Sequence, residues 1–138
     1  MAAVRSKDTE PEMLLRRELH ARGLRYRLHG KLPGRPDLVF GPARVAVFVD
    51  GDFWHGHGWR ERGFTSWESQ FRNHRDPAKW QAKIGRNIQR DLEVTAELEA
   101  RGWVVLRVLE SVVRRDVSAV AEKVEATVRA RRATQDAH

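Results

Sequence analysis

The chain lacks cysteine altogether, and this absence excludes two kinds of stabilising device. With no thiol among its 138 residues, it can form neither a disulfide nor a thiolate zinc site. Long apolar runs are missing as well, since no stretch approaches the roughly 20 residues that a membrane-spanning helix needs. The N-terminus, Met1 to Lys7, is too polar for a secretion signal. We therefore expect a cytoplasmic protein that makes no membrane contact.

Acidic residues are the minority among the charged ones. The chain has 26 Lys and Arg residues against 19 Asp and Glu residues, a formal net charge of +7, which favours a polyanionic partner such as nucleic acid. A chain of this length suits one compact core. We expect residues 1–138 to form a single domain, with a flexible arm over 1–8 and a flexible tail over 133–138.

Local signals predict an α/β fold. Thr9 and Glu12 have the spacing of a capping box, with Pro11 in the first turn, so a helix should begin at Thr9. The expected elements are a helix over 9–21, a short strand around 26–28, a hairpin over 37–50, a helix from 76 to about 101, a strand over 103–108 and a helix from 116 onward. The return strand after a crossover helix must run parallel to a neighbour, which predicts a mixed sheet flanked by helices.

The expected hairpin contains two candidate metal-binding carboxylates. Asp37 stands at the head of one apolar run and Asp50 at the end of the next. We expect the turn between the two runs to consist of Gly41, Pro42 and Ala43. In an antiparallel hairpin these two carboxylates converge at one end of the sheet. Carboxylates so placed suit Mg²⁺, which needs only one or two protein carboxylates. Taken singly, each acid has a simpler explanation, because Pro-Asp pairs are common in turns and polar residues usually follow a strand.

The long helix combines an apolar stripe with a cationic row. Trp80, Ile84, Ile88 and Leu92 recur every four residues. The row, expected on the opposite face, consists of Lys79, Lys83, Arg86 and Arg90, with Asn87 among them. It is either a solvated face or a track for DNA phosphates, and no acid interrupts it. We favour the track, and we place Arg35 of the loop before Asp37 on the same DNA-binding surface.

Two further features have competing explanations. Phe53 and Trp54 follow the hairpin directly, and such aromatics either join the core or protrude as wedges that open a base step. Glu12 is fully explained as a capping-box partner, but the first helix can equally aim it at the hairpin end.

Four segments, in matching order over roughly residues 5–112, resemble one known family. They are Pro33–Asp37, Phe48–His57, Lys83–Asp91 and Leu98–Val108. Together they resemble the very-short-patch repair endonucleases of the PD-(D/E)XK nuclease superfamily. The resemblance implies a restriction-endonuclease-like fold and a Mg²⁺-dependent enzyme that nicks one DNA strand at or near a T:G-type mismatch, leaving a 5′-phosphate.

The resemblance also implies roles for individual residues. Asp37 matches the essential metal-binding aspartate, Val49 the residue whose backbone carbonyl completes the metal site, and Glu12 the acid of the first helix that supports it. His55 matches the base that activates water. Phe53 and Trp54 match the aromatics that wedge beside the mismatched pair, which favours the functional interpretation of both. Asp50 stands where relatives have histidine or aspartate, and we expect it to help Asp37 fix one or two Mg²⁺ ions.

The chain departs from the family pattern at two places. Relatives hold a structural zinc with cysteines and histidine, and the matching positions here are Asp52, His57, Trp59 and Ser111. Only His57 is a strong zinc ligand, so we expect no structural zinc. The superfamily's lysine two residues after the second acid is Asp52 here. Water activation must then come from elsewhere, and the imidazole of His55 titrates in the right range.

Three functions stay open at this point. The first is mismatch-directed nicking in DNA repair, by a monomer working beside other repair or methylation-system proteins. The second is a related nuclease that cuts modified or specific DNA in a restriction or defence role. The third, a non-catalytic module that binds double-stranded DNA, gives no reason for Asp37, Asp50 and His55 to occur together.

Overall fold

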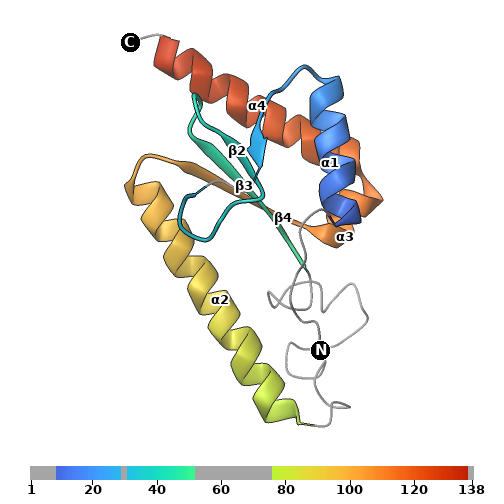
Figure 1. Cartoon of the computed structure of the whole chain (residues 1–138), viewed down its shortest axis with the longest axis vertical. Coiled ribbons are helices and arrows are strands. Elements are labelled where there is room, and N and C mark those ends of the chain that lie inside the picture. Colours follow the sequence, from blue (N-terminus) through green and yellow to red (C-terminus); the bar gives the residue numbers. More distant parts are fainter. Residues whose placement is uncertain (1–8, 29–30, 52–75, 137–138) are drawn as a thin grey trace.

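The computed structural model describes residues 9–28, 31–51 and 76–136. The elements in chain order are α1 (Glu10–Ala21), β1 (Arg27–Leu28), β2 (Leu38–Phe40), β3 (Val45–Asp50), α2 (Pro77–Ala100), β4 (Val104–Leu109), α3 (Glu110–Arg115) and α4 (Val117–Asp136). The strands form one sheet in the order β1-β2-β3-β4. Helices lie against both faces of it (Figure 1). The expected mixed sheet flanked by helices is confirmed.

The hairpin of β2 and β3 forms as predicted and joins a parallel neighbour. Leu38 pairs with Val47 and Phe40 with Val45 in antiparallel register, while β3 and β4 run parallel. The connecting turn is one residue longer than expected. Arg44 belongs to it, with a left-handed φ of 57°, and its N–H donates to the Gly41 carbonyl at 3.1 Å.

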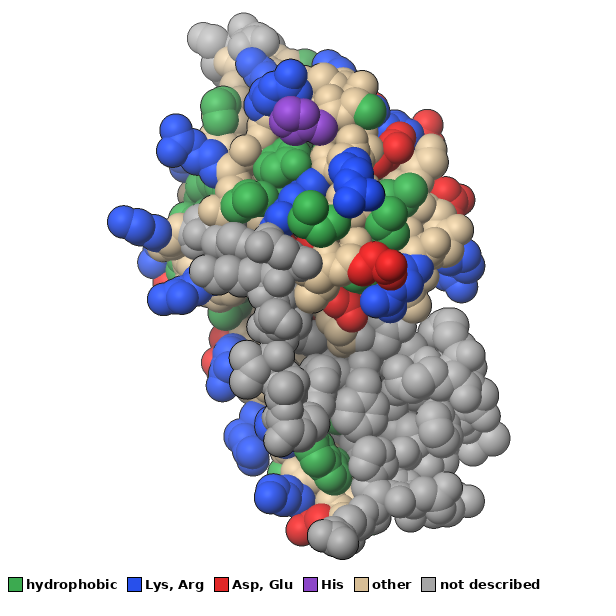
Figure 2. Space-filling view, turned by 45° about the vertical axis from the view of Figure 1, so that its right-hand side comes forward, with side chains coloured by type: hydrophobic (Ala, Val, Ile, Leu, Met, Phe, Trp, Pro, Cys, Tyr) green, Lys and Arg blue, Asp and Glu red, His purple; other side chains and the backbone are tan. Residues whose placement is uncertain are grey.

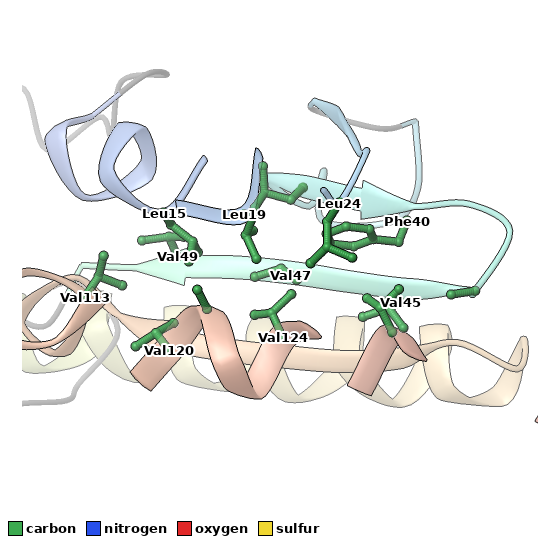
Figure 3. Close-up of a cluster of buried hydrophobic side chains, with 14 residues drawn as sticks. Leu15, Leu19, Leu24, Phe40, Val45, Val47, Val49, Val113, Val120 and Val124 are labelled. Atoms are coloured by element: carbon green, nitrogen blue, oxygen red, sulfur yellow. The ribbon is translucent and has the colours of Figure 1, made fainter. Parts of the chain in front are cut away.

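β3 is buried on both faces, which explains its unbroken apolar sequence. Val45, Val47 and Val49 belong to a cluster that α1 and α4 complete (Figure 3). Figure 3 shows Leu15 and Leu19 of α1, and Val120 and Val124 of α4, gathered against these three valines. On the other face, Ala46 and Phe48 pack with Val94 and Leu98 of α2. The strand that ends at Asp50 is therefore held firmly between two layers.

α1 begins and ends where the sequence predicts, but its capping differs. Thr9 is the N-cap residue and Pro11 lies in the first turn, yet the Thr9 side chain makes no cap hydrogen bond. The predicted capping hydrogen bond of the Thr9 side chain is therefore wrong. Glu12 is almost fully buried, and its carboxylate pairs with Arg16, one turn along the helix, at 3.0 Å. Gly23, with φ 83°, follows the helix end.

The buried face of α2 differs from the predicted apolar stripe. Ile84 is fully buried, but Leu92 is 62% exposed, and Val94 and Leu98 take its place in the core. The physical reason is that each four-residue step turns an α-helix by about 40° beyond a full circle. A strict four-residue spacing therefore winds away from the sheet along a helix of this length.

The C-terminal part contains one element that the sequence did not predict. The six-residue α3 lies between β4 and α4. Asp116 begins the next helix, accepting a hydrogen bond from the Ala119 N–H at 3.0 Å, and Val120, Val124 and Val128 are buried as expected. α4 continues to Asp136, so residues 133–136 of the expected tail are helical. Within the described ranges, no helix is long and apolar enough to cross a membrane.

Arg22 ties the end of α1 to α4. Its guanidinium contacts Glu18 at 3.0 Å and Glu125 at 3.2 Å, and it donates to the Ser118 hydroxyl at 3.0 Å. Hydrogen bonds from Arg129 and from Arg22 hold the pKa of the Glu125 carboxyl below its ordinary value. The two helices that cover one face of the sheet are thus joined by a charged contact near the surface.

We predict that Glu125→Gln lowers the thermal unfolding midpoint slightly at neutral pH and not in acid. A depressed carboxyl pKa stabilises the fold above the pKa of the unfolded chain, and this contribution is lost as the pH falls below about 4. Thermal melts between pH 7 and pH 3 measure it. Glu122→Gln, at an exposed position of the same helix, is the control. A difference between wild type and Glu125→Gln that stays constant over this range would contradict the prediction.

Candidate active site

A hollow of about 180 Å³ opens at the end of the hairpin, between the sheet and α2. Its described lining comes from the loop before β2 and from β3, β4 and α2. The lining residues are Gly34, Arg35, Asp37, Phe48, Val49, Asp50, Arg90, Asp91, Val94 and Arg107. The structure therefore brings Asp37, Val49 and Asp50 together with two of the arginines expected at DNA, Arg35 and Arg90.

Asp37 sits at the base of this hollow. Its carboxylate is buried, with the residue 4% exposed, and its Oδ2 accepts a hydrogen bond from the Val49 N–H at 2.7 Å. The antiparallel register that pairs Leu38 with Val47 places Asp37 opposite Phe48, on the sheet face that α2 covers. The backbone of β3, near the end of that strand, thus holds the Asp37 carboxylate in place.

Asp50 lies on the same face, two residues beyond Phe48. It is as buried as Asp37, and Nη1 of Arg107 lies 3.3 Å from its Oδ1 and 3.2 Å from its Oδ2. Arg107 belongs to β4, in register with Phe48, and its guanidinium lies over the Phe48 ring, 4.1 Å from the ring centroid. The sequence analysis missed Arg107, although a single charge inside the apolar run 103–109 is a usable signal.

α2 contributes a second acid that the sequence analysis also missed. Asp91 lines the hollow, and its Oδ1 lies 3.6 Å from Nη1 of Arg107. Its signal is its position one residue after Arg90, on the side of the helix that meets the sheet. Among the described residues, three acids and three arginines line the hollow, so their formal charges offset one another.

The cationic row runs along α2 beside the hollow. Of its four residues only Arg90 lines the hollow, while Lys79 and Arg86 are exposed and Lys83 is half-buried, its Nζ 5.6 Å from the Trp80 ring centroid. At about 100° per residue the row lies roughly a quarter turn from the buried positions, not on the opposite face as predicted. In Figure 2, Lys and Arg side chains follow the lower left edge, along α2. Asn87 is half-buried.

The structure shows one predicted site residue away from the described lining of the hollow, and it leaves several others undescribed. Glu12 is buried beside Arg16 in α1 and does not belong to the described lining. Phe53, Trp54 and His55, together with Asp52, His57 and Trp59 of the zinc comparison, lie outside the described residues. Ser111 lies in α3, half-buried. The roles assigned to these residues stay predictions.

The donor set suits a hard cation. Two buried carboxylates and the Val49 backbone meet at the hollow, and oxygen donors of this kind fit Mg²⁺, which keeps several waters and takes few protein ligands. Among residues 9–28, 31–51 and 76–136, no three His, Cys, Asp or Glu side chains are grouped for a metal ion. The described part therefore offers a partial coordination shell, as expected for a site completed by water and substrate phosphate.

Comparison with known proteins identifies the family of the chain. Residues 1–61 match the family model described as DNA mismatch endonuclease Vsr. Over 115 residues the chain is 35% identical to the DNA mismatch endonuclease Vsr of Escherichia coli, covering 83% of this chain and 69% of that protein. This chain belongs to the Vsr family. The resemblance drawn from its motifs is confirmed.

Two other relatives share a higher sequence identity with the chain. The type II nicking enzyme V.NmeDIP of Neisseria meningitidis serogroup C is 44% identical over 130 residues, 94% of this chain and 83% of that enzyme. The type II nicking enzyme V.XorIIP of Xanthomonas oryzae pv. oryzae is 44% identical over 106 residues, covering 76% and 72%. The chain is a Vsr-family DNA nicking endonuclease, and DNA is its substrate.

We predict that Gly34→Ala destabilises the protein by about 1–3 kcal/mol. Gly34 has φ 76°, and a Cβ there lies 2.6 Å from Val94 Cγ1 of α2, so the hollow's loop must move away from the helix. Chemical denaturation measures the change. Gly41→Ala is the matched control, because a Cβ there meets nothing within 4 Å. Equal effects of the two substitutions would contradict this account of the loop.

Proposed function

We propose that this Vsr-family enzyme nicks one strand of double-stranded DNA at a specific sequence or modified base, in a restriction or defence role, with Mg²⁺ as cofactor. The observation that carries this choice is the match over 94% of the chain to a relative named as a type II nicking enzyme. The hollow supports the chemistry, since it combines buried carboxylates with guanidinium groups.

The oxygen donors of the hollow indicate where the proposed Mg²⁺ would bind. Asp37 and the Val49 carbonyl, with Asp50 nearby, would hold Mg²⁺. When bound, Mg²⁺ supplies Lewis-acid stabilisation of the charge that develops on the phosphate and on the leaving 3′ oxygen.

The chain's own residues have three tasks in this reaction. Arg35 and Arg90, at the rim of the hollow, attract the phosphate to be cut, and the row that continues with Lys79, Lys83 and Arg86 tracks the backbone beyond it. His55 takes the proton from the water that attacks phosphorus. The bond from phosphorus to the 3′ oxygen breaks, which leaves a 5′-phosphate and a 3′-hydroxyl.

We assign recognition of the DNA site to the segment after β3. Phe53 and Trp54 act as wedges that unstack a base step, at a cost of a few kcal/mol that a distorted or modified site lowers. Glu12 and Arg16, a buried pair at the start of α1, support the end of the hairpin from the opposite layer. The enzyme acts as a monomer.

Mismatch-directed nicking is the second candidate function. It is favoured by the description of the matching family model, DNA mismatch endonuclease, and by the name of the Escherichia coli relative. The same hollow serves both functions, because the chemistry of strand cleavage does not depend on what marks the site. What differs is the base step that the wedge residues open most easily.

A panel of duplexes tests the proposal and separates the two functions. The panel contains intact sequences, each of the mismatches and common modified bases, with each strand labelled separately. We expect Mg²⁺-dependent cuts in one strand only, at an intact or modified sequence. Cleavage confined to T:G-type mismatches would instead establish the repair function, and binding without any cut would leave only a DNA-binding module.

We predict that Asp37→Asn reduces nicking below about one hundredth of the wild-type rate while duplex affinity changes little, because a metal ligand acts mainly on the transition state. Asparagine keeps the shape and an oxygen that can accept the Val49 N–H. Glu99→Gln, at an exposed position of α2, is the matched control. Rates come from single-turnover assays and affinities from fluorescence anisotropy. A nearly active Asp37→Asn variant would remove Asp37 from the site.

A further inference from the structure

We infer that Arg107 is a catalytic residue, whose guanidinium contacts the phosphate to be cut and stabilises the negative charge that grows on this phosphate in the transition state. The inference rests on the proposed nicking function and deepens it. It assigns a role to an arginine that no motif of the chain points to. It also adds a half-buried cation to the two exposed ones, Arg35 and Arg90, that attract the phosphate.

Arg107 differs from the other two arginines of the described lining in its burial. Arg35 and Arg90 are exposed, whereas the Arg107 side chain is only 21% exposed. Arg107 is also the one charged residue of β4, and a charge among apolar strand residues is costly to bury unless it is paired or has a task. Dissolved salt screens an exposed charge strongly and a partly buried one much less. Arg107 therefore gives the hollow a positive charge that solvent weakens less than those of Arg35 and Arg90.

The guanidinium of Arg107 is held in one orientation by neighbouring elements. Its Nε donates to Thr95 Oγ1 on α2 at 3.1 Å, and its Nη1 contacts both carboxylate oxygens of Asp50 on β3, at 3.3 and 3.2 Å. The guanidinium carbon also lies 4.1 Å from the centroid of the Phe48 ring. Donors that are fixed in advance stabilise a transition state without having to reorganise during the reaction. The contacts of Arg107 provide such an arrangement.

One N–H group of Arg107 remains for the phosphate. A guanidinium has five N–H groups, two of them on Nη2. The Arg107 Nη2 donates to the Asp91 carbonyl at 3.4 Å, and among its contacts with described residues this bond uses one of the two hydrogens. The second hydrogen can be donated to a phosphate oxygen while Nε and Nη1 keep their partners. Hydrogen bonds to anionic oxygens are shorter and stronger than those to neutral carbonyls, so a phosphate can also compete for the hydrogen of the long bond.

The acids of the hollow explain why such a donor is needed. Asp37, Asp50 and Asp91 belong to the described lining, and carboxylates repel an approaching phosphate. Arg107 keeps its proton at any working pH, so its charge is present throughout. In the hydrolysis, a bond from the attacking water oxygen to phosphorus forms, the bond to the 3′ oxygen breaks, and charge is spread over the non-bridging oxygens. Arg107 donates a hydrogen bond to one of these oxygens and transfers no proton.

Single-turnover nicking by Arg107 variants tests the role. At saturating duplex, we expect Arg107→Met to cut about 10²–10³-fold more slowly than wild type, the usual effect of losing one transition-state donor. Arg107→Lys keeps the charge without the planar fork and should recover part of this loss. Arg101→Met, which removes an exposed arginine that pairs with Glu97, is the control. Rates are expressed per folded enzyme, measured by circular dichroism. An Arg107→Met rate equal to that of wild type would overturn the inference.

Sulfur substitution at the cut phosphate separates a direct contact from a structural contribution. Duplexes carry an Rp or an Sp phosphorothioate at the position mapped with the duplex panel, and each is cut in Mg²⁺ and in Mn²⁺. We expect one isomer to be cut slowly in Mg²⁺ and to recover in Mn²⁺, which tolerates sulfur better. Wild type should cut the other isomer about tenfold more slowly than the all-oxygen duplex in either ion. Arg107→Met should cut these two duplexes at equal rates, because the contact that sulfur weakens is already lost.

The outcomes of the sulfur experiment distinguish the inference from the proposed function. Equal sulfur effects in wild type and Arg107→Met, for both isomers, would overturn the inference, since a structural arginine slows cleavage of all duplexes alike. If Arg107→Met does not fold, the same comparison with Arg107→Lys decides, and a smaller sulfur effect than in wild type is expected. A wild type that cuts no duplex at all would refute the proposed function and the inference with it.

Discussion

The burial of β3 on both faces is the constraint on which the rest of the structure depends. α1 and α4 cover Val45, Val47 and Val49 on one face, and α2 covers Ala46 and Phe48 on the other. Hydrogen bonding to β2 and to β4 fixes both of its edges. A strand held on four sides cannot slip in register, so Val49 and Asp50 at its end are placed with little freedom. The hollow lies at this firmly held end of β3.

The hollow is lined by two buried carboxylates, those of Asp37 and Asp50. Carboxylates are seldom as buried as Asp37 and Asp50 unless they are paired or coordinate a cation. In this protein Asp37 accepts a hydrogen bond from the Val49 N–H, and Asp50 pairs with Arg107. In the described part of the lining, arginines offset the charge of the acids, which favours the approach of a phosphate group that the carboxylates alone would repel. This arrangement suits cleavage of a polyanion by a basic protein.

The parts that the sequence predicts correctly depend on local signals. The hairpin follows from two apolar runs and a short turn, and the convergence of Asp37 with Asp50 follows from the hairpin alone. The contact between Asp50 and Arg107 joins residues 57 positions apart, and no local pattern reveals it. The buried face of α2 was predicted wrongly at Leu92 because helical periodicity leaves two adjacent faces open until the sheet selects one. The burial of Glu12 is also not encoded by the capping motif, although its pairing with Arg16, four residues along, has ordinary helical spacing.

The central claim is that Asp37, at the end of the buried hairpin, organises the metal site of a nicking endonuclease. The most direct measurement is an anomalous difference map from crystals of the enzyme with Mn²⁺ and a nicked duplex. The account predicts a peak within coordination distance of the Asp37 carboxylate and the Val49 carbonyl. No peak in the hollow would contradict it.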